Sequence, residues 1–283
     1  MSRQSGGSRQ HGSQSRNIDG HHEGVIAQVK SIVTQLDGVL SSSPHEWATY
    51  VPSARSAMGA IDRIHFFRDR QRFAEQIWVL QGLQDFAYHD PDSGCIRDIA
   101  EWCQIAWLRI LQDHPENLEA LTGGLKLLTG DSAITELDAV TNHLCDIGLG
   151  SNWLQMSQAT LAQIHRQEGT GVLGQDSDDA AAYPPDPRRQ GPLYVEARGY
   201  LQPAVDFYAR AVQSANARGS TTGGLLASAA ESNMSLGNVT APPGDERHFT
   251  QAIHYLRLAE AIPNFLLSTY LQEYLNDYGR YVS

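Results

Sequence analysis

Apolar residues recur every three or four positions along most of the chain after residue 24, the spacing that places them on one face of an α-helix. Four such stripes occupy the first part of the chain, at residues 25–36, 57–67, 73–86 and 96–111. Breakers rich in proline, glycine, serine and aspartate separate them, and no alternating pattern is long enough for a β-strand. The sequence therefore predicts an all-α chain of antiparallel helix pairs.

Two segments lack this periodicity. Residues 1–20 are rich in serine, glutamine, glycine and arginine and hold almost no apolar residue, so we expect a disordered tail. Residues 167–192 combine glycines, an aspartate cluster and several prolines, which is typical of a flexible loop.

Composition narrows the class of protein. The 283 residues include 21 basic and 32 acidic ones, a net charge of −11, which argues against a nucleic acid or another polyanion as ligand. No apolar run approaches the roughly 20 residues of a membrane span, and no secretory signal follows the start, so we expect a cytoplasmic or nuclear protein. The three cysteines have no C-x-x-C spacing and fit neither a disulfide framework nor a structural zinc site.

Three segments resemble the second helix of the tetratricopeptide repeat (TPR), a helix-turn-helix unit of about 34 residues. In that helix small residues lie where the paired helices cross closely, large residues fill the adjacent holes, and a proline follows. The matching positions are Cys103, Trp107 and Pro115 in the first segment, Ala204, Tyr208 and Ala211 in the second, and Ala252, Leu256, Ala259 and Pro263 in the third. The resemblance is to an irregular repeat protein and covers residues 93–265.

The first-helix half of the TPR pattern is divided between two places. Leu121 and Gly123 begin it, and Leu149, Gly150 and Trp153 complete it, with residues 124–148 between them. Without those residues the sequence fits W-x2-L-G-x2-Y. We hypothesise that they are a retained intron or belong to an alternative isoform, which transcript sequencing would decide. Alternatively, Asp131 caps a genuine inserted helix with an apolar stripe of its own. Both interpretations predict a disturbance of the helical array here.

The resemblance implies a fold of stacked antiparallel helix pairs, a TPR-like right-handed superhelix or α-solenoid. We expect helices over residues 21–92 that pack on the array, repeats over 93–265 and a capping helix over 266–283. TPR-like arrays bind a peptide or helix of a partner protein in the concave groove lined by their first helices. The corresponding positions here are Glu119, Thr122, Asn152 and Gln155, a neutral to acidic set that favours a basic or apolar ligand.

Two further motifs match functional signatures only in part. Residues 169–174 spell G-x-G-x-x-G, but the dinucleotide fingerprint follows a strand, whereas a helix is expected before this segment. His21, His22 and Glu23 carry metal-ligating groups, but adjacent histidines at the foot of a disordered tail do not form a preorganised site. We interpret them as solvated residues.

The sequence motifs for a catalytic cysteine and for a nucleic-acid-binding surface are also incomplete. Cys95 or Cys103 with a histidine could form a nucleophile pair, but Cys103 lies on an apolar stripe in a slot for a small residue, which favours burial. Arg68, Arg70 and Arg72 lie near aromatic residues taken to be exposed, a combination found in RNA-binding surfaces. The acidic residues beside them indicate a salt-bridged face instead: Asp62, Asp69 and Glu75.

The sequence therefore predicts a non-catalytic adaptor or scaffold that binds another protein, with no cofactor, no metal, no nucleic acid and no membrane contact. One alternative is an α-helical enzyme, which needs a pocket with convergent histidine and acidic side chains. The other is an RNA-associated helical repeat protein, which needs a continuous stripe of arginines on one surface.

Overall fold

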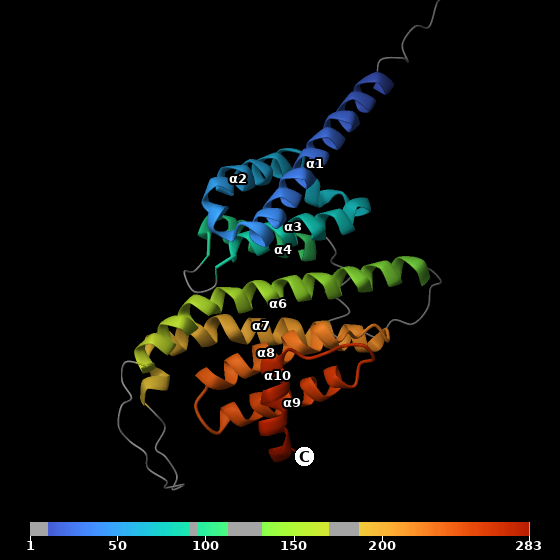
Figure 1. The fold of residues 1–283 in the computed structure, drawn as a ribbon. Helices are drawn as coiled ribbons and strands as arrows, with labels where there is room; N and C mark the ends of the chain where they lie inside the picture. Colours follow the sequence, from blue (N-terminus) through green and yellow to red (C-terminus); the bar gives the residue numbers. More distant parts are fainter. Residues whose placement is uncertain (1–10, 91–94, 113–131, 170–186, 283) are drawn as a thin grey trace, which may run out of the picture. The chain divides into compact units, whose positions relative to one another are not determined.

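The computed structural model describes residues 11–90, 95–112, 132–169 and 187–282, and these ranges contain helices and no strand (Figure 1). The expected all-α class is confirmed. The chain divides into two compact units. The first comprises Met1–His89 with Arg97–Ala106, and the second comprises Asp90–Ile96 with Trp107–Ser283. One division between the units falls between Ala106 and Trp107, inside a helix. None of the described helices is long and apolar enough to cross a bilayer.

The first unit is built on three helices: α1 (His11–Ser42), α2 (Trp47–Arg63) and α3 (Phe73–Ala87). Short 3-10 turns connect them, η1 (Pro44–Glu46) before α2 and η2 (Phe66–Arg68) and η3 (Arg70–Arg72) before α3. Helix α1 packs on both α2 and α3. Gly82 permits the close approach of α3, because a Cβ there would lie 2.4 Å from Val33 Cγ1.

Helix α1 begins at His11, within the segment expected to be a disordered tail. Its buried stripe starts only at Ile26 and continues through Val29, Val33 and Leu36. Packing of this stripe stabilises the helix. Each further turn toward the N-terminus then adds backbone hydrogen bonds without a new nucleation cost. The periodicity therefore located the packed part of α1, and helix propagation extends it beyond that part.

Helix α4 (Arg97–Gln112) contributes its first turns to the first unit. Asp98 binds Arg55 on α2, and the Trp102 indole donates to Asp62 at 3.0 Å. Cys103 is completely buried, as its place on the apolar stripe predicted.

The second unit stacks helices in chain order. Helices α6 (Ser132–Gly169) and α7 (Pro192–Ala217) lie side by side and run in opposite directions (Figure 1). Helix α7 packs on α8 (Gly223–Val239), α8 packs on α9 (Gly244–Glu260), and α10 (Thr269–Tyr278) packs on α9. Two 3-10 turns complete the unit, η4 (Pro187–Gln190) before α7 and η5 (Gly279–Tyr281) after α10.

Small residues allow the helices of this unit to approach closely. A Cβ at Gly150 would lie 3.0 Å from the Tyr208 ring, and a Cβ at Gly148 would lie 2.4 Å from the ring of the buried Trp107. Most of the positions that matched the repeat pattern are buried: Leu149, Gly150, Ala204, Tyr208, Ala211, Ala252, Leu256 and Ala259. Trp153 is half-buried and Pro263 is exposed, while Pro115, Leu121 and Gly123 lie outside the described residues.

The described part of the predicted insertion is helical. Helix α6 runs from Ser132 across residues 148 and 149 to Gly169 without interruption. A helix over these residues agrees with the second interpretation of the segment, that of an inserted helix, while a retained intron remains a hypothesis that only transcripts can test. No break disturbs α6 where the two halves of the motif would have been joined.

Candidate functional site

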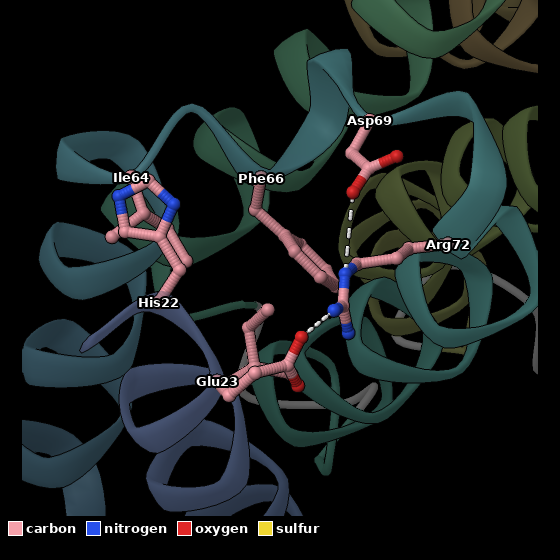
Figure 2. Close-up of a pocket in the computed structure, with 7 residues that line it drawn as sticks. His22, Glu23, Ile64, Phe66, Asp69 and Arg72 are labelled. Atoms are coloured by element: carbon pink, nitrogen blue, oxygen red, sulfur yellow. Dashed lines mark hydrogen bonds and ion pairs between the residues drawn. The ribbon is translucent and has the colours of Figure 1, made fainter. Parts of the chain in front are cut away.

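A pocket of about 180 Å³ in the first unit lies where α1 meets the η2 and η3 turns (Figure 2). The side chain of Asp69 accepts a hydrogen bond from the Gln71 backbone N–H at 3.1 Å and so begins η3. The buried amide of Gln76 donates to the carbonyl oxygens of Phe66 and Asp69, both at 2.7 Å. Hydrogen bonds within η3 and from Gln76 on α3 thus fix the backbone that positions Arg72.

Arg72 forms ion pairs with three carboxylates. Its Nε lies 3.2 Å from Asp69, its Nη1 donates to Glu75 at 2.9 Å, and its Nη2 donates to Glu23 on α1, the last contact being visible in Figure 2. Lys30 on α1 also binds Glu75, at 2.9 Å. Hydrogen bonds from Lys30 and then Arg72 hold the pKa of Glu75 below its ordinary value. The predicted ion-paired face at Arg72 is confirmed.

Two expectations about this region are wrong. Phe66 and Phe67 are buried rather than exposed, because the η2 turn directs both rings into the core. Glu23 is not merely solvated, since it pairs with Arg72. Among the described residues, no group of three histidine, cysteine or acidic side chains could hold a metal ion.

The charged groups of this pocket pair with one another and so connect two helices. The positive charge of Arg72 is matched by three carboxylates, so it offers little to an anionic ligand. A carboxyl with a lowered pKa, such as Glu75, stays ionised and is a poor proton donor near neutral pH. The ion pairs connect α1 to the start of α3.

The buried thiols are unreactive. Burial raises the pKa of Cys103 well above its usual range and that of Cys145 to about 12. A thiol is nucleophilic only as its thiolate, so neither cysteine is activated at neutral pH. The G-x-G-x-x-G segment follows helix α6, which ends at Gly169, as expected, and its remaining residues lie outside the described ranges.

The structure describes two of the four residues predicted to line a partner-binding groove. Glu119 and Thr122 lie outside the described residues. Asn152 is completely buried and Gln155 is half-buried on α6. Both follow the glycine positions at which α6 packs closely against other side chains, which explains why Asn152 is not available to a ligand.

A second candidate site is the outer surface of α10. Tyr270, Tyr274 and Tyr278 are spaced four residues apart and form one row along the helix, and Glu273 and Asp277 form a second row beside it. We call these five residues the tyrosine face. Tyr270 is 62% exposed and Tyr278 53%, and both carboxylates are exposed.

Helix α10 is held firmly beneath this face. Ser268 caps its first turn by accepting from the Leu271 N–H, and Leu271 and Leu275 are buried in the core shared with α9. Arg257 on α9 donates to two carbonyl oxygens beyond the end of α10, those of Gly279 and Val282. The tyrosine face is therefore presented by a helix whose position is already fixed.

Two rings of the tyrosine face are in contact. The centroids of Tyr274 and Tyr278 are 4.8 Å apart. Burial, and next the neighbouring Tyr270 and Tyr278, raise the pKa of Tyr274 to about 12. Close to this face, the guanidinium of Arg280 lies 4.8 Å from the ring centroid of Tyr281, which is 72% exposed.

Sequence reasoning interpreted this helix as a cap and gave it no binding role. The sequence feature that indicates an exposed face is the presence of two separate stripes in one helix, one of leucines at 271 and 275 and one of tyrosines at 270, 274 and 278. The leucines and the half-buried Tyr274 pack against the core, whereas Tyr270 and Tyr278 remain exposed and are not needed for that packing.

Comparison with models of protein families, with curated proteins and with solved structures found no match to this chain.

Proposed function

We propose that this protein is a non-catalytic adaptor that binds another protein through the tyrosine face. The observation that carries the proposal is the exposure of Tyr270 and Tyr278 on a helix already anchored by Leu271 and Leu275. Tyrosine is enriched at protein interfaces because it supplies a large contact area and a hydrogen-bonding group at low entropic cost. A fixed helix also reduces the ordering cost of binding.

A TPR-like array remains part of the proposal. It is supported by the packing of α6 to α9 in chain order, which is typical of helical repeats, and by the buried small residues Ala204, Ala211 and Ala252. We place the main contact on the tyrosine face rather than in a groove around Asn152, since that side chain is buried. We also propose a reducing compartment, the cytoplasm or nucleus, in keeping with the buried thiols of Cys103 and Cys145.

The arrangement of the arginines favours a protein ligand over RNA. Arg55, Arg72 and Arg210 pair with carboxylates on other helices. Arg198 and Arg257 donate to backbone carbonyl oxygens. Guanidinium groups committed in this way are less available to a row of phosphates, which an RNA-binding stripe would need.

Affinity purification of the full chain tests the proposal. The wild type is compared with the double variant Tyr270→Ala/Tyr278→Ala and with Asn276→Ala, an exposed substitution on the same helix outside the tyrosine face. We expect at least one protein to be enriched by the wild type and by Asn276→Ala and to be lost with the tyrosine variant. Identical sets of co-purifying proteins for all three, or none for any of them, would overturn the proposal.

A further inference from the structure

We propose that the tyrosine face binds an extended, arginine-containing segment of a partner protein, with guanidinium groups stacked on the tyrosine rings and neutralised by Glu273 and Asp277. This inference rests on the proposed function and specifies the chemistry of the partner. Three observations support it: the unpaired carboxylates of this face, the contact of a neighbouring arginine with a tyrosine ring, and the spacing of the tyrosines.

The two carboxylates of the tyrosine face differ from Glu260 and Asp245, which have partners. Glu260 accepts a hydrogen bond from Gln272, and Asp245 pairs with Arg189. Glu273 and Asp277 are exposed and make no ion pair or hydrogen bond with the described residues. Their combined charge lies directly beside three aromatic rings, because residues three and four apart are neighbours on a helix.

Aromatic rings beside uncompensated carboxylates select for a cation. A ring face attracts a cation, and a carboxylate within reach supplies the opposite charge. Among biological cations the guanidinium fits best, since it is planar, stacks on aromatic rings and loses its hydration more readily than an ammonium group. An acidic or phosphorylated ligand would be repelled by Glu273 and Asp277.

The same end of the molecule already holds one such contact. The guanidinium of Arg280 lies over the Tyr281 ring at 4.8 Å. Arg280 follows the tyrosine face by two residues, so a guanidinium is accommodated on an exposed tyrosine in this environment. The rings of Tyr270 and Tyr278 have no such occupant among the described residues.

The spacing of the row fixes the register of the ligand. Tyrosines four residues apart are separated by roughly 6 Å along the helix axis. In an extended peptide alternate residues point to the same side and are about 6.8 Å apart. Arginines at every second position, R-x-R-x-R, therefore match the row. The arginines of the chain's own N-terminal segment, Arg3, Arg9 and Arg16, are spaced too widely to do so.

The test measures binding of synthetic peptides to the full chain by fluorescence anisotropy. The probes are twelve-residue peptides of alternating arginine and serine, of alternating lysine and serine, and of alternating leucine and serine. The protein variants are Tyr270→Ala/Tyr278→Ala, Tyr270→Phe/Tyr278→Phe, Glu273→Gln/Asp277→Asn and the control Asn276→Ala. Thermal unfolding verifies that each variant is folded, which the exposure of these side chains leads us to expect.

We expect the arginine peptide to bind more tightly than the lysine peptide by at least about threefold. The alanine double variant should lose about tenfold in affinity for the arginine peptide, and the phenylalanine variant should retain it because the rings remain. The amide variant should bind more weakly and with a smaller dependence on salt. Asn276→Ala should bind as the wild type does.

Several results would overturn the inference. Equal binding of the arginine and lysine peptides, unchanged in the alanine variant, would indicate attraction to the acidic chain as a whole. Preference for the leucine peptide would assign the face to an apolar partner, and a dimer lost in the alanine variant would assign it to a second copy. If the arginine peptide fails while a co-purifying protein still depends on the tyrosines, the adaptor proposal stands and only this inference falls.

Discussion

Arg257 on α9 donates its Nη2 to the carbonyl oxygen of Gly279 at 2.9 Å and so joins α9 to the segment that follows α10. The same nitrogen donates to Val282 at 2.7 Å. Carbonyl groups at a helix C-terminus have no partner within the helix, and a cation there also interacts favourably with the helix dipole. This contact positions one end of the tyrosine face.

Replacing that arginine should loosen the C-terminal helix. We expect Arg257→Ala to lower the free energy of unfolding by about 1 kcal/mol, since two hydrogen bonds from a partly exposed charged group are lost. Hydrogen exchange of the backbone amides in residues 275–282 should accelerate. Arg247→Ala is the matched control: it removes an exposed arginine of the same helix and should leave this exchange unchanged. Unaltered protection in Arg257→Ala would contradict the anchoring role.

Gly148 is required by the ring of Trp107. A Cβ at this position would lie 2.4 to 2.6 Å from three atoms of that completely buried ring, so Gly148→Ala should destabilise the protein by about 1 to 3 kcal/mol. Gly199→Ala on α7 is the control, because a Cβ there meets nothing within 4 Å. The control should gain about 0.5 to 1 kcal/mol from helix propensity. Urea unfolding of both variants measures the difference, and equal stabilities would refute the close contact.

Because Arg72 is ion-paired, its contribution to the free energy of unfolding should depend on pH. We expect Arg72→Gln to lower the free energy of unfolding at pH 7 by about 1 kcal/mol. Because Lys30 and Arg72 lower the folded-state pKa of Glu75, this stabilisation is present above the ordinary value of 4.5 and is lost as the pH falls through the lower folded value. Arg68→Gln, an exposed arginine without an ion pair among the described residues, should show no such change. A difference between Arg72→Gln and wild type that persisted at pH 2 would argue against ionic attraction.

The ionised carboxylate of Glu231 on α8 should lower the stability of the folded protein at neutral pH, whereas that of Glu75 raises it. Burial raises its pKa, so the folded state favours the protonated carboxyl and the ionised form costs stability. We expect Glu231→Gln to raise the melting temperature at pH 7, and the gain should vanish below the ordinary value of 4.5, where the carboxyl is protonated in both states. Glu246→Gln, at an exposed position on α9, should have no effect at either pH. A gain that did not change with pH would point to packing rather than desolvation.

Local reasoning from the sequence succeeded where the physical cause is local. The stripe through Ile26, Val33 and Leu36 predicted α1 and its buried face, and the slot assigned to Cys103 predicted a buried thiol. The acids beside Arg72 predicted its pairing with Asp69 and Glu75, because both lie within one turn of it.

Expectations about exposure were less successful, since exposure depends on what packs from elsewhere in the chain. Asn152 is polar and was assigned to a binding groove, yet its neighbours Gly148 and Gly150 bring other side chains so close that α6 is buried there. Phe66 and Phe67 follow a helix end and were taken to be exposed, but His65 adopts a left-handed conformation (φ 52°) that turns the chain and directs both rings inward.

The sequence by itself determined that the chain is helical, where its apolar faces lie and that its surface is acidic, because helix periodicity and charge are properties of neighbouring residues. Only the tertiary structure decided that the chain divides into two units, that Arg72 reaches Glu23, and that Tyr270 and Tyr278 remain exposed. These outcomes depend on contacts between residues far apart in the chain. In α10 the two leucines and Tyr274 pack against the core, and Tyr270 and Tyr278 stay exposed.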